Sequence, residues 1–383
     1  MTCGVSRIAY NSVSEGNNQR KRGNGWELRD IINADCLDGL RSLPDGIADM
    51  CVTSPPYYGL RDYGCEGQIG LEETPEAYIE RLVAVFREVW RVLRDDGTLW
   101  VNIGDSYAGS GKGGQSNEKR SENWQPQYGN KGKTYGLKPK DLIGIPWMLA
   151  FALRADGWYL RQDIIWHKPS PMPESVTDRC TKAHEYIFLL SKSARYYFNN
   201  EAIREPCSPA NVHDFLARKT LDNKSNGAGS YEDARPDLCR SRDAYMPDDF
   251  MRNKRDVWEL KQNPRPFAKK GNNDRNDTGN IYVDNGYRQK RNVWAVATKP
   301  YSGAHFAVFP PDLIRPCIRA GSRQGGIVLD PFIGSGTTAE VAIEECRGCI
   351  GIELNPEYAE MARKRMNQAI RNYQPEFAFI DAM

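Results

Sequence analysis

Two short stretches, far apart in the chain, carry residues that could do chemistry. The first, Ser54-Pro55-Pro56-Tyr57, follows the mostly apolar run 48–52. Two successive prolines end a strand, because neither has an N–H to give to a sheet and each keeps the preceding residue extended. We expect a stiff turn at the carboxyl end of a buried strand, although these four residues alone would also fit a surface turn. Hydrogen-bond acceptors beside a stacking ring suit a flat ring that carries an amine, such as a nucleobase turned out of its helix.

The second stretch is Asp330-Pro331-Phe332-Ile333-Gly334-Ser335-Gly336-Thr337, between an apolar strand and a helix. A glycine turn in that place brings a ligand close to the backbone N–H groups at a helix N-terminus. The next strand ends in Glu353, and an acid there is positioned to bind the hydroxyls of a ribose. The pattern therefore predicts an adenosine-type cofactor. The missing third glycine of G-x-G-x-x-G counts against a nicotinamide cofactor.

Strands and helices alternate around both stretches, which indicates a doubly wound α/β sheet. Thr74 and Pro75 are a typical helix start, as N-cap and first helical residue. We expect strands over 26–35, 48–52, 98–103, 158–166, 184–191, 195–198, 293–296, 326–329 and 349–352. We expect helices over 36–43, 75–93, 140–156, 310–320, 338–345 and 356–373, with a turn at 95–97.

The regularity fades between residues 199 and 291, where Asn, Asp, Arg, Gly and Pro dominate. Basic residues gather there with Trp258 and Phe267 between them, which suits a module that reads a DNA groove; the alternative is a solvated insertion. The predicted DNA-binding residues are Arg252, Lys254, Arg255, Lys261, Arg265, Lys269 and Lys270. The predicted regions are a flexible tail 1–25, a catalytic half 26–198 with a mobile loop 104–136, a recognition region 199–291, a cofactor-binding half 292–373, and a C-terminal tail 374–383.

The net charge, the apolar content and the cysteine count of the chain exclude few classes of protein. The formal net charge of the 383 residues is only +2, so a nucleic-acid surface must come from local clustering. We expect no membrane span and no secretory signal, because no long apolar run occurs and the N-terminus is polar. Scattered cysteines suit a reducing cytoplasm. Cys346 and Cys349 form a single C-x-x-C pair, which is incomplete as a zinc site, so no metal is expected.

In this order, the two stretches resemble the S-adenosylmethionine-dependent DNA amino-methyltransferases, in the β-type arrangement that has the catalytic motif first and the cofactor motif last. The resemblance covers about residues 26–200 and 292–372. It implies a Rossmann-like methyltransferase fold with an inserted recognition region, and catalysis by Ser54, Pro55, Pro56 and Tyr57. It also implies that S-adenosylmethionine is bound by Asp35 near the adenine, by Glu353 at the ribose, and by residues around the methionine half. The cofactor-binding set is Asp35, His305, Phe306, Asp330, Phe332, Gly334, Gly336, Thr337 and Glu353.

Within this family, a serine at the first position of the catalytic motif usually goes with N4 of cytosine, and Asp or Asn with N6 of adenine. Ser54 therefore favours N4-methylcytosine, with N6-methyladenine as the alternative. An RNA or protein methyltransferase, an inactive DNA-binding relative and a nicotinamide oxidoreductase are the remaining alternatives. The expected partner is double-stranded DNA. A homodimer and a cognate restriction endonuclease are expected from the resemblance, in a bacterial, archaeal or phage-encoded protein of the cytoplasm.

Overall fold

The computed structural model describes residues 29–60, 64–109, 136–174, 176–206, 287–298 and 309–373. Several predicted features lie outside these ranges. They are both tails, most of the loop 104–136, most of the region 199–291 with its seven basic residues, and His305 and Phe306.

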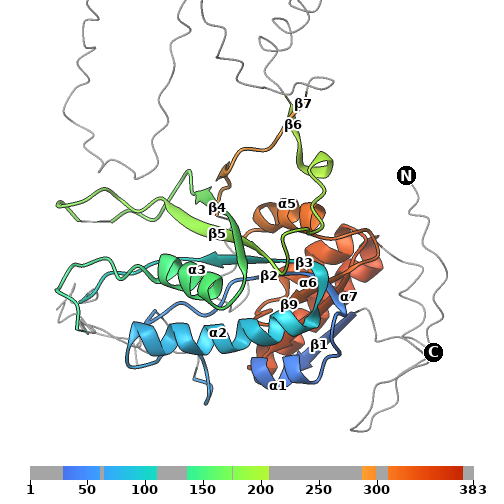
Figure 1. Cartoon of the computed structure of the whole chain (residues 1–383), viewed down its shortest axis with the longest axis horizontal. Helices are drawn as coiled ribbons and strands as arrows, with labels where there is room; N and C mark the ends of the chain where they lie inside the picture. The colour runs from blue at the N-terminus through green and yellow to red at the C-terminus, as the bar shows by residue number, and fades with distance from the viewer. Residues whose placement is uncertain are drawn as a thin grey trace, which may run out of the picture. The chain divides into compact units, whose positions relative to one another are not determined.

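The described residues form an eight-stranded sheet in the order β1-β10-β9-β2-β3-β5-β4-β8 (Figure 1). Its strands are β1 (Arg29–Asn33), β2 (Ala48–Thr53), β3 (Leu93–Ile103), β4 (Tyr159–His167), β5 (His184–Ser191), β8 (Val293–Ala295), β9 (Ile327–Asp330) and β10 (Gly348–Glu353). Neighbouring strands are parallel from β1 to β3, whereas β5 runs antiparallel to both β3 and β4. The predicted doubly wound α/β class is confirmed, and β5 is the strand that departs from the parallel direction.

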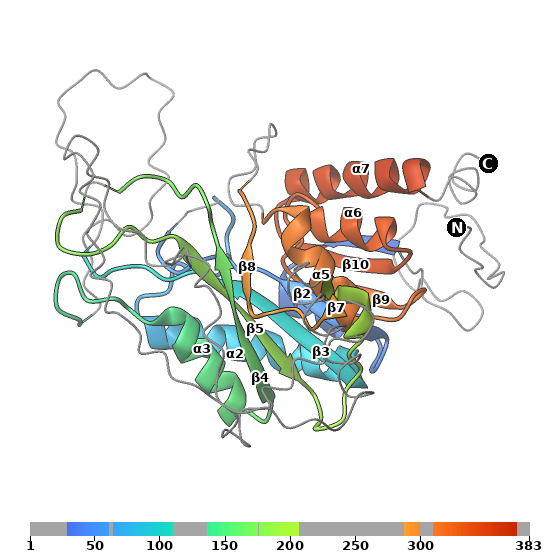
Figure 2. The same cartoon turned by 90° about the horizontal axis from the view of Figure 1, so that it is seen from above.

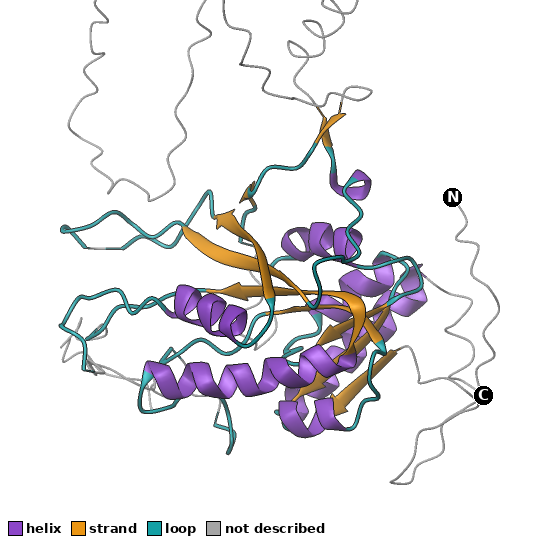
Figure 3. Ribbon diagram, viewed as in Figure 1, coloured by secondary structure: helices purple, strands orange, loops and turns teal. Residues whose placement is uncertain are grey.

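Helices cover both faces of the sheet (Figures 2 and 3). Helices α1 (Cys36–Arg41), α2 (Pro75–Val92) and α3 (Ile145–Ala155) share one apolar core with the sheet, and α5 (Pro311–Gly321), α6 (Thr337–Glu344) and α7 (Pro356–Tyr373) share the other. Tyr78 and Phe86 of α2 are fully buried in the first core, and Leu313 of α5 in the second. Each large side chain buried in this way contributes about 1.5–3 kcal/mol.

Helix α2 begins as its sequence predicts and ends earlier. The Thr74 hydroxyl accepts a hydrogen bond from the N–H of Ala77 at 3.2 Å, and Pro75 is the first helical residue. The helix ends at Val92, and the chain enters β3 directly at Leu93. The turn predicted at 95–97 lies instead inside the first part of β3, where the pairing with β2 shifts register.

One other predicted boundary and one predicted strand are wrong. Helix α3 begins at Ile145 rather than at residue 140, because Gly144 has φ +86° and the Asp105 carboxylate accepts the N–H groups of Gly144 and Ile145 at 3.0 and 3.1 Å. Residues 195–198 form no strand. The ring of Phe198 instead stacks on that of Trp100, with the centroids 6.3 Å apart.

Residues 171–183 and 204–290 form a unit separate from the sheet and its helices. Its described part includes the antiparallel pair of β6 (Glu205–Pro206) and β7 (Tyr287–Arg288), with an ion pair between Lys290 and Glu205 at 3.2 Å. The short 3-10 helix η1 (Glu201–Ile203) belongs to the first unit. Among the described helices, none has the length and apolar character needed to cross a membrane.

Candidate active site

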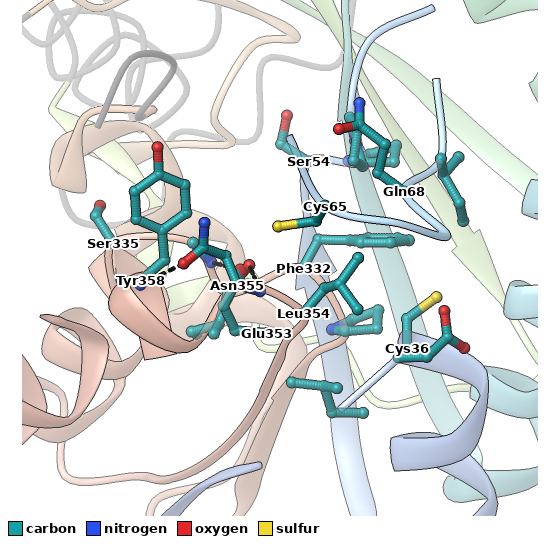
Figure 4. A pocket seen from close by; sticks show the side chains of 18 of the residues that line it. Cys36, Ser54, Cys65, Gln68, Phe332, Ser335, Glu353, Leu354, Asn355 and Tyr358 are labelled. Atoms are coloured by element: carbon teal, nitrogen blue, oxygen red, sulfur yellow. Dashed lines mark hydrogen bonds between the residues drawn. The ribbon is translucent and has the colours of Figure 1, made fainter. Parts of the chain in front are cut away.

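A pocket of about 1070 Å³, including the space at its mouth, lies where four neighbouring parallel strands end. These strands are β1, β10, β9 and β2, and ligands of open α/β sheets bind at this edge. In Figure 4, Ser54 and Cys36 stand at opposite ends of the pocket, and Glu353, Asn355 and Tyr358 come from one wall. The two stretches singled out in the sequence therefore face the same space.

The turn after β2 brings all four predicted catalytic residues, Ser54 to Tyr57, to the pocket. Strand β2 is buried along its whole length. The two prolines that follow it have no N–H to donate, so the strand ends there, at the edge of the sheet where the parallel strands have their carboxyl ends. The Tyr78 hydroxyl donates a hydrogen bond to the backbone carbonyl of Pro56 at 2.8 Å, which ties the turn to α2. Gly70 packs against the same backbone, since a Cβ on it would lie 3.1 Å from the carbonyl oxygen of Tyr57.

Residues of β3 and β5 hold the Tyr57 side chain in place. Its hydroxyl donates to the Glu185 carboxylate at 2.7 Å and lies 3.4 Å from Oδ1 of Asn102. Its ring lies against Gly104, where a Cβ would come within 2.8 Å of Cε2. Burial raises the pKa of Tyr57 well above its usual value, and the charge of Glu185 raises it further. The phenol therefore stays protonated and able to donate.

Glu353 organises the glycine turn that follows β9. One carboxylate oxygen accepts the N–H of Gly334 at 2.9 Å, and the other accepts the N–H of Asn355 at 2.9 Å. Burial raises the pKa of Glu353, and these backbone donors oppose the rise. Phe332, Gly334 and Thr337 line the pocket with Glu353, and with Asp35 five of the predicted cofactor residues line it.

Two other predicted cofactor residues, Asp330 and Gly336, do not line the pocket and lie behind the turn. Asp330 is 1% exposed and does not line the pocket. Its carboxylate accepts hydrogen bonds from the hydroxyls of Thr53 and Thr338, both at 2.6 Å, because a buried charge needs such donors. Gly336 has φ +85° and faces α7, where a Cβ would lie 2.8 Å from Cα of Ala362. Both residues hold the turn in its shape.

Asp35 lies at the far end of the pocket, at the start of α1. Its carboxylate accepts the N–H of Leu37 at 2.9 Å as the N-cap. The neighbouring Cys36 also lines the pocket, and burial raises its pKa to about 12. A neutral thiol is a poor nucleophile, so this cysteine does not suit covalent chemistry. Phe309 reaches the pocket from the segment that follows His305 and Phe306.

Sequence reasoning missed Glu185, Asn102 and Lys168 as site residues. Lys168, at the end of β4, pairs with the second oxygen of Glu185, and its ammonium lies 4.4 Å from the ring centroid of Trp166. The Asn102 amide donates to Glu185 at 3.3 Å and to the carbonyl of Tyr186 at 3.0 Å. One signal was present, since Glu185 is a charged residue near the start of an otherwise apolar strand.

Comparisons with known proteins agree on one family. A DNA methylase family model, N6_N4_Mtase, matches residues 48–364. The type II methyltransferase M.SmaI of Serratia marcescens is 44% identical over 336 residues, covering 88% of this chain and 90% of that protein. M.Cfr9I of Citrobacter freundii, also a type II methyltransferase, is 42% identical over 336 residues, covering 88% and 87%.

A solved structure is similar in fold. It is the PvuII DNA methyltransferase, described as cytosine-N4-specific, with a TM-score of 0.52 and 17% identity. The match covers 88% of this chain and 85% of that chain. At this level of identity the likeness supports the methyltransferase fold alone.

Proposed function

The chain belongs to the N6/N4 family of DNA methylases, and from this premise we propose that it transfers a methyl group from S-adenosylmethionine to N4 of a flipped cytosine in DNA. The observation that carries the proposal is the single pocket shared by the Ser54 turn and the Glu353-anchored glycine turn. A methyl donor and an acceptor amine held by these two turns would meet between them.

The pocket residues fit S-adenosylmethionine. Glu353 offers carboxylate lone pairs for the ribose hydroxyls, and Asp35 stands at the end where the adenine amine would lie. Phe332 supplies an apolar wall, and the backbone around Gly334 and Thr337 can approach the methionine half closely. When bound, the sulfonium supplies an activated methyl group, and the electrons of the broken S–C bond remain on sulfur.

The catalytic turn would prepare the amine for attack. An exocyclic amine is a poor nucleophile, because its lone pair is delocalised into the ring. The Ser54 hydroxyl and the Pro55 carbonyl would accept the two N–H bonds and aim the nitrogen lone pair at the methyl group. The ring of Tyr57 would stack on the extruded base, which is worth about 1–3 kcal/mol. The second proline, Pro56, keeps the turn rigid through its bond from Tyr78.

Ser54 is the basis for choosing cytosine over adenine, since serine at this position goes with N4 methylation in the family. The type II relatives support a further part of the proposal, that the protein is the modification enzyme of a restriction–modification system. The recognition region 199–291 with its basic residues, the homodimer and the cognate endonuclease remain predictions.

The test is to incubate the protein with unmethylated duplex DNA and methyl-labelled S-adenosylmethionine, digest the DNA to nucleosides, and identify the labelled one by mass spectrometry. Label in N4-methylcytosine supports the whole proposal. Label in N6-methyladenine would keep the site and overturn the base assignment. Bound cofactor with unlabelled DNA would overturn the choice of DNA as substrate.

A further inference from the structure

S-adenosylmethionine carries one carboxylate, and the described lining of the pocket offers it no cation. The lining residues in the described ranges include the acids Asp35 and Glu353 but no lysine or arginine, so neutral donors must meet this charge there. The order of the strands places Glu353, at the end of β10, between Asp35 after β1 and the glycine turn after β9. A cofactor with its adenine at Asp35 and its ribose at Glu353 therefore has its carboxylate end at the glycine turn.

The hydroxyls of Ser335 and Thr337 are two neutral donors at this turn. Both residues line the pocket and both are 2% exposed. In Figure 4, Ser335 lies on the opposite side of the pocket from Cys36. Thr337 is the first residue of α6, and no side chain caps that helix. The first N–H groups of a helix have no partner within it, so an anion is favoured at this place.

Arg365 of α7 lies behind the two hydroxyls and fixes the direction of their hydrogen bonds. Its Nη1 atom donates to Oγ1 of Thr337 at 2.9 Å and to Oγ of Ser335 at 3.3 Å, and its Nε atom donates to Glu340 at 2.8 Å. A guanidinium can only donate, so each hydroxyl oxygen is an acceptor here and keeps its own proton for another group. Within the described ranges, no group of the protein accepts either proton.

We propose that Arg365 is a positioning residue that directs the hydroxyls of Ser335 and Thr337 toward the carboxylate of S-adenosylmethionine. Arg365 does not line the pocket and acts through the hydroxyls, whose O–H groups become stronger donors when their oxygens accept a hydrogen bond. Glu340 balances the charge of the guanidinium, so the effect is one of direction. The inference rests on the cofactor site of the proposed function and names the cofactor group that this part of the site recognises.

Two ligands that differ only in the carboxylate test this role by calorimetry. Decarboxylated S-adenosylmethionine keeps the adenosine, the sulfonium and the amine. The wild-type protein should bind S-adenosylmethionine about 10–100-fold more tightly, which is the range for hydrogen bonds to a charged group. Arg365→Met keeps an unbranched stem and removes the donors. It should bind S-adenosylmethionine at least about tenfold more weakly, with unchanged affinity for the decarboxylated ligand.

Further variants separate the hydroxyls from the fold of the helix. Thr337→Val should show the same selective loss, and Thr337→Ser, which keeps the hydroxyl, should bind as the wild type does. Arg365→Lys keeps the charge but loses the planar fork that reaches Glu340 and both hydroxyls at once, so it should show a smaller loss in the same direction. Lys364→Gln, at a side chain of α7 that is 76% exposed, is the matched control and should bind as the wild type does.

The two ligands also separate this role from a structural one. A residue that only stabilised the turn would, when replaced, weaken binding of both ligands equally. Equal losses in the Arg365 variants, or equal affinities of the wild-type protein for the two ligands, would therefore overturn the inference. Unlabelled DNA together with an intact preference for S-adenosylmethionine would overturn the proposed function and leave the role of Arg365 in place.

Discussion

The hydroxyl of Thr53, the last residue of β2, donates a 2.6 Å hydrogen bond to the carboxylate of Asp330, the last residue of β9. The two residues are 277 positions apart in the sequence. Thr53 immediately precedes the catalytic stretch that begins at Ser54, and Asp330 is the first residue of the cofactor stretch. Both are fully buried. This bond therefore fixes the catalytic turn relative to the cofactor turn, because the strands that carry them are neighbours in the sheet.

Thr53→Val should destabilise the protein and loosen this link. The substitution keeps the shape and removes one donor from a buried carboxylate, which costs about 1–3 kcal/mol. Urea unfolding measures the change in the free energy of unfolding. Thr53→Ser, which keeps the hydroxyl, should lose less than half as much, and equal losses in the two variants would show that the methyl group and not the bond matters.

The stability contributed by Asp330 should decrease as the pH rises. Burial raises its pKa from 3.8 to about 6, so the folded protein binds this proton more tightly than the unfolded chain. The contribution is fully present below pH 3.8 and is lost as the pH rises through about 6. At about 1.36 kcal/mol per pH unit, the loss is at most about 3 kcal/mol.

Asp330→Asn removes this titration and provides the comparison. The difference in free energy of unfolding, wild type minus variant, should fall by up to about 3 kcal/mol between pH about 4 and about 7. Urea titrations at several pH values would measure it. A difference that does not change with pH would mean that Asp330 has an ordinary pKa in the folded protein.

Ser54→Ala and Tyr57→Ala should damage different steps. Loss of the hydroxyl removes an acceptor of the amine, and the single-turnover rate should drop by about 10²-fold while DNA affinity is kept. Loss of the ring removes stacking worth about 1–3 kcal/mol, so 2-aminopurine fluorescence should show a smaller flipped population. Rapid-quench and fluorescence measurements on the same DNA separate the two, and identical profiles would contradict the assigned roles.

Glu353→Gln should weaken binding of S-adenosylmethionine. A carboxylate that accepts the N–H groups of Gly334 and Asn355 becomes an amide with only one acceptor oxygen, so the glycine turn loses a charge-assisted bond. Loss of about 1.5–3 kcal/mol corresponds to a 10–100-fold higher Kd, by roughly 1.4 kcal/mol per tenfold. Calorimetry measures it, and Glu357→Gln, an exposed acid in the first turn of α7, should bind as the wild type does.

The sequence predicted those parts of the fold that follow from local chemistry. Pro55 and Pro56 end a strand because they have no N–H for a neighbouring strand. Thr74 and Pro75 favour the start of a helix. The glycine turn requires residues with positive φ, as Gly334 and Gly336 have. These features do not depend on distant residues. The placement of both functional turns at one sheet edge followed from the α/β pattern alone.

The remaining features depend on contacts between distant residues. The sequence does not predict that β5 runs antiparallel to β3. This pairing brings Glu185 within hydrogen-bond distance of Asn102 and Tyr57. The burial of Asp330 likewise follows from its neighbour Thr53 in three dimensions. A carboxylate in a motif can bind a ligand or hold the motif together, and only its surroundings distinguish the two.

Gly104→Ala should disturb Tyr57 without touching the cofactor turn. A Cβ at Gly104 would lie 2.8 Å from Cε2 of Tyr57, closer than side chains tolerate, and 3.5 Å from the Glu185 carboxyl carbon. The ring cannot retreat freely, because its hydroxyl is bonded to Glu185 at 2.7 Å. Methyl transfer should therefore slow by at least about tenfold, as small displacements of positioned groups cost up to about 10²-fold. Calorimetric affinity for S-adenosylmethionine should be unchanged.

In the Tyr57→Ala background the added methyl group meets no ring, so Gly104→Ala should have little further effect there. A full additional loss in that background would mean that Gly104 acts on another part of the site.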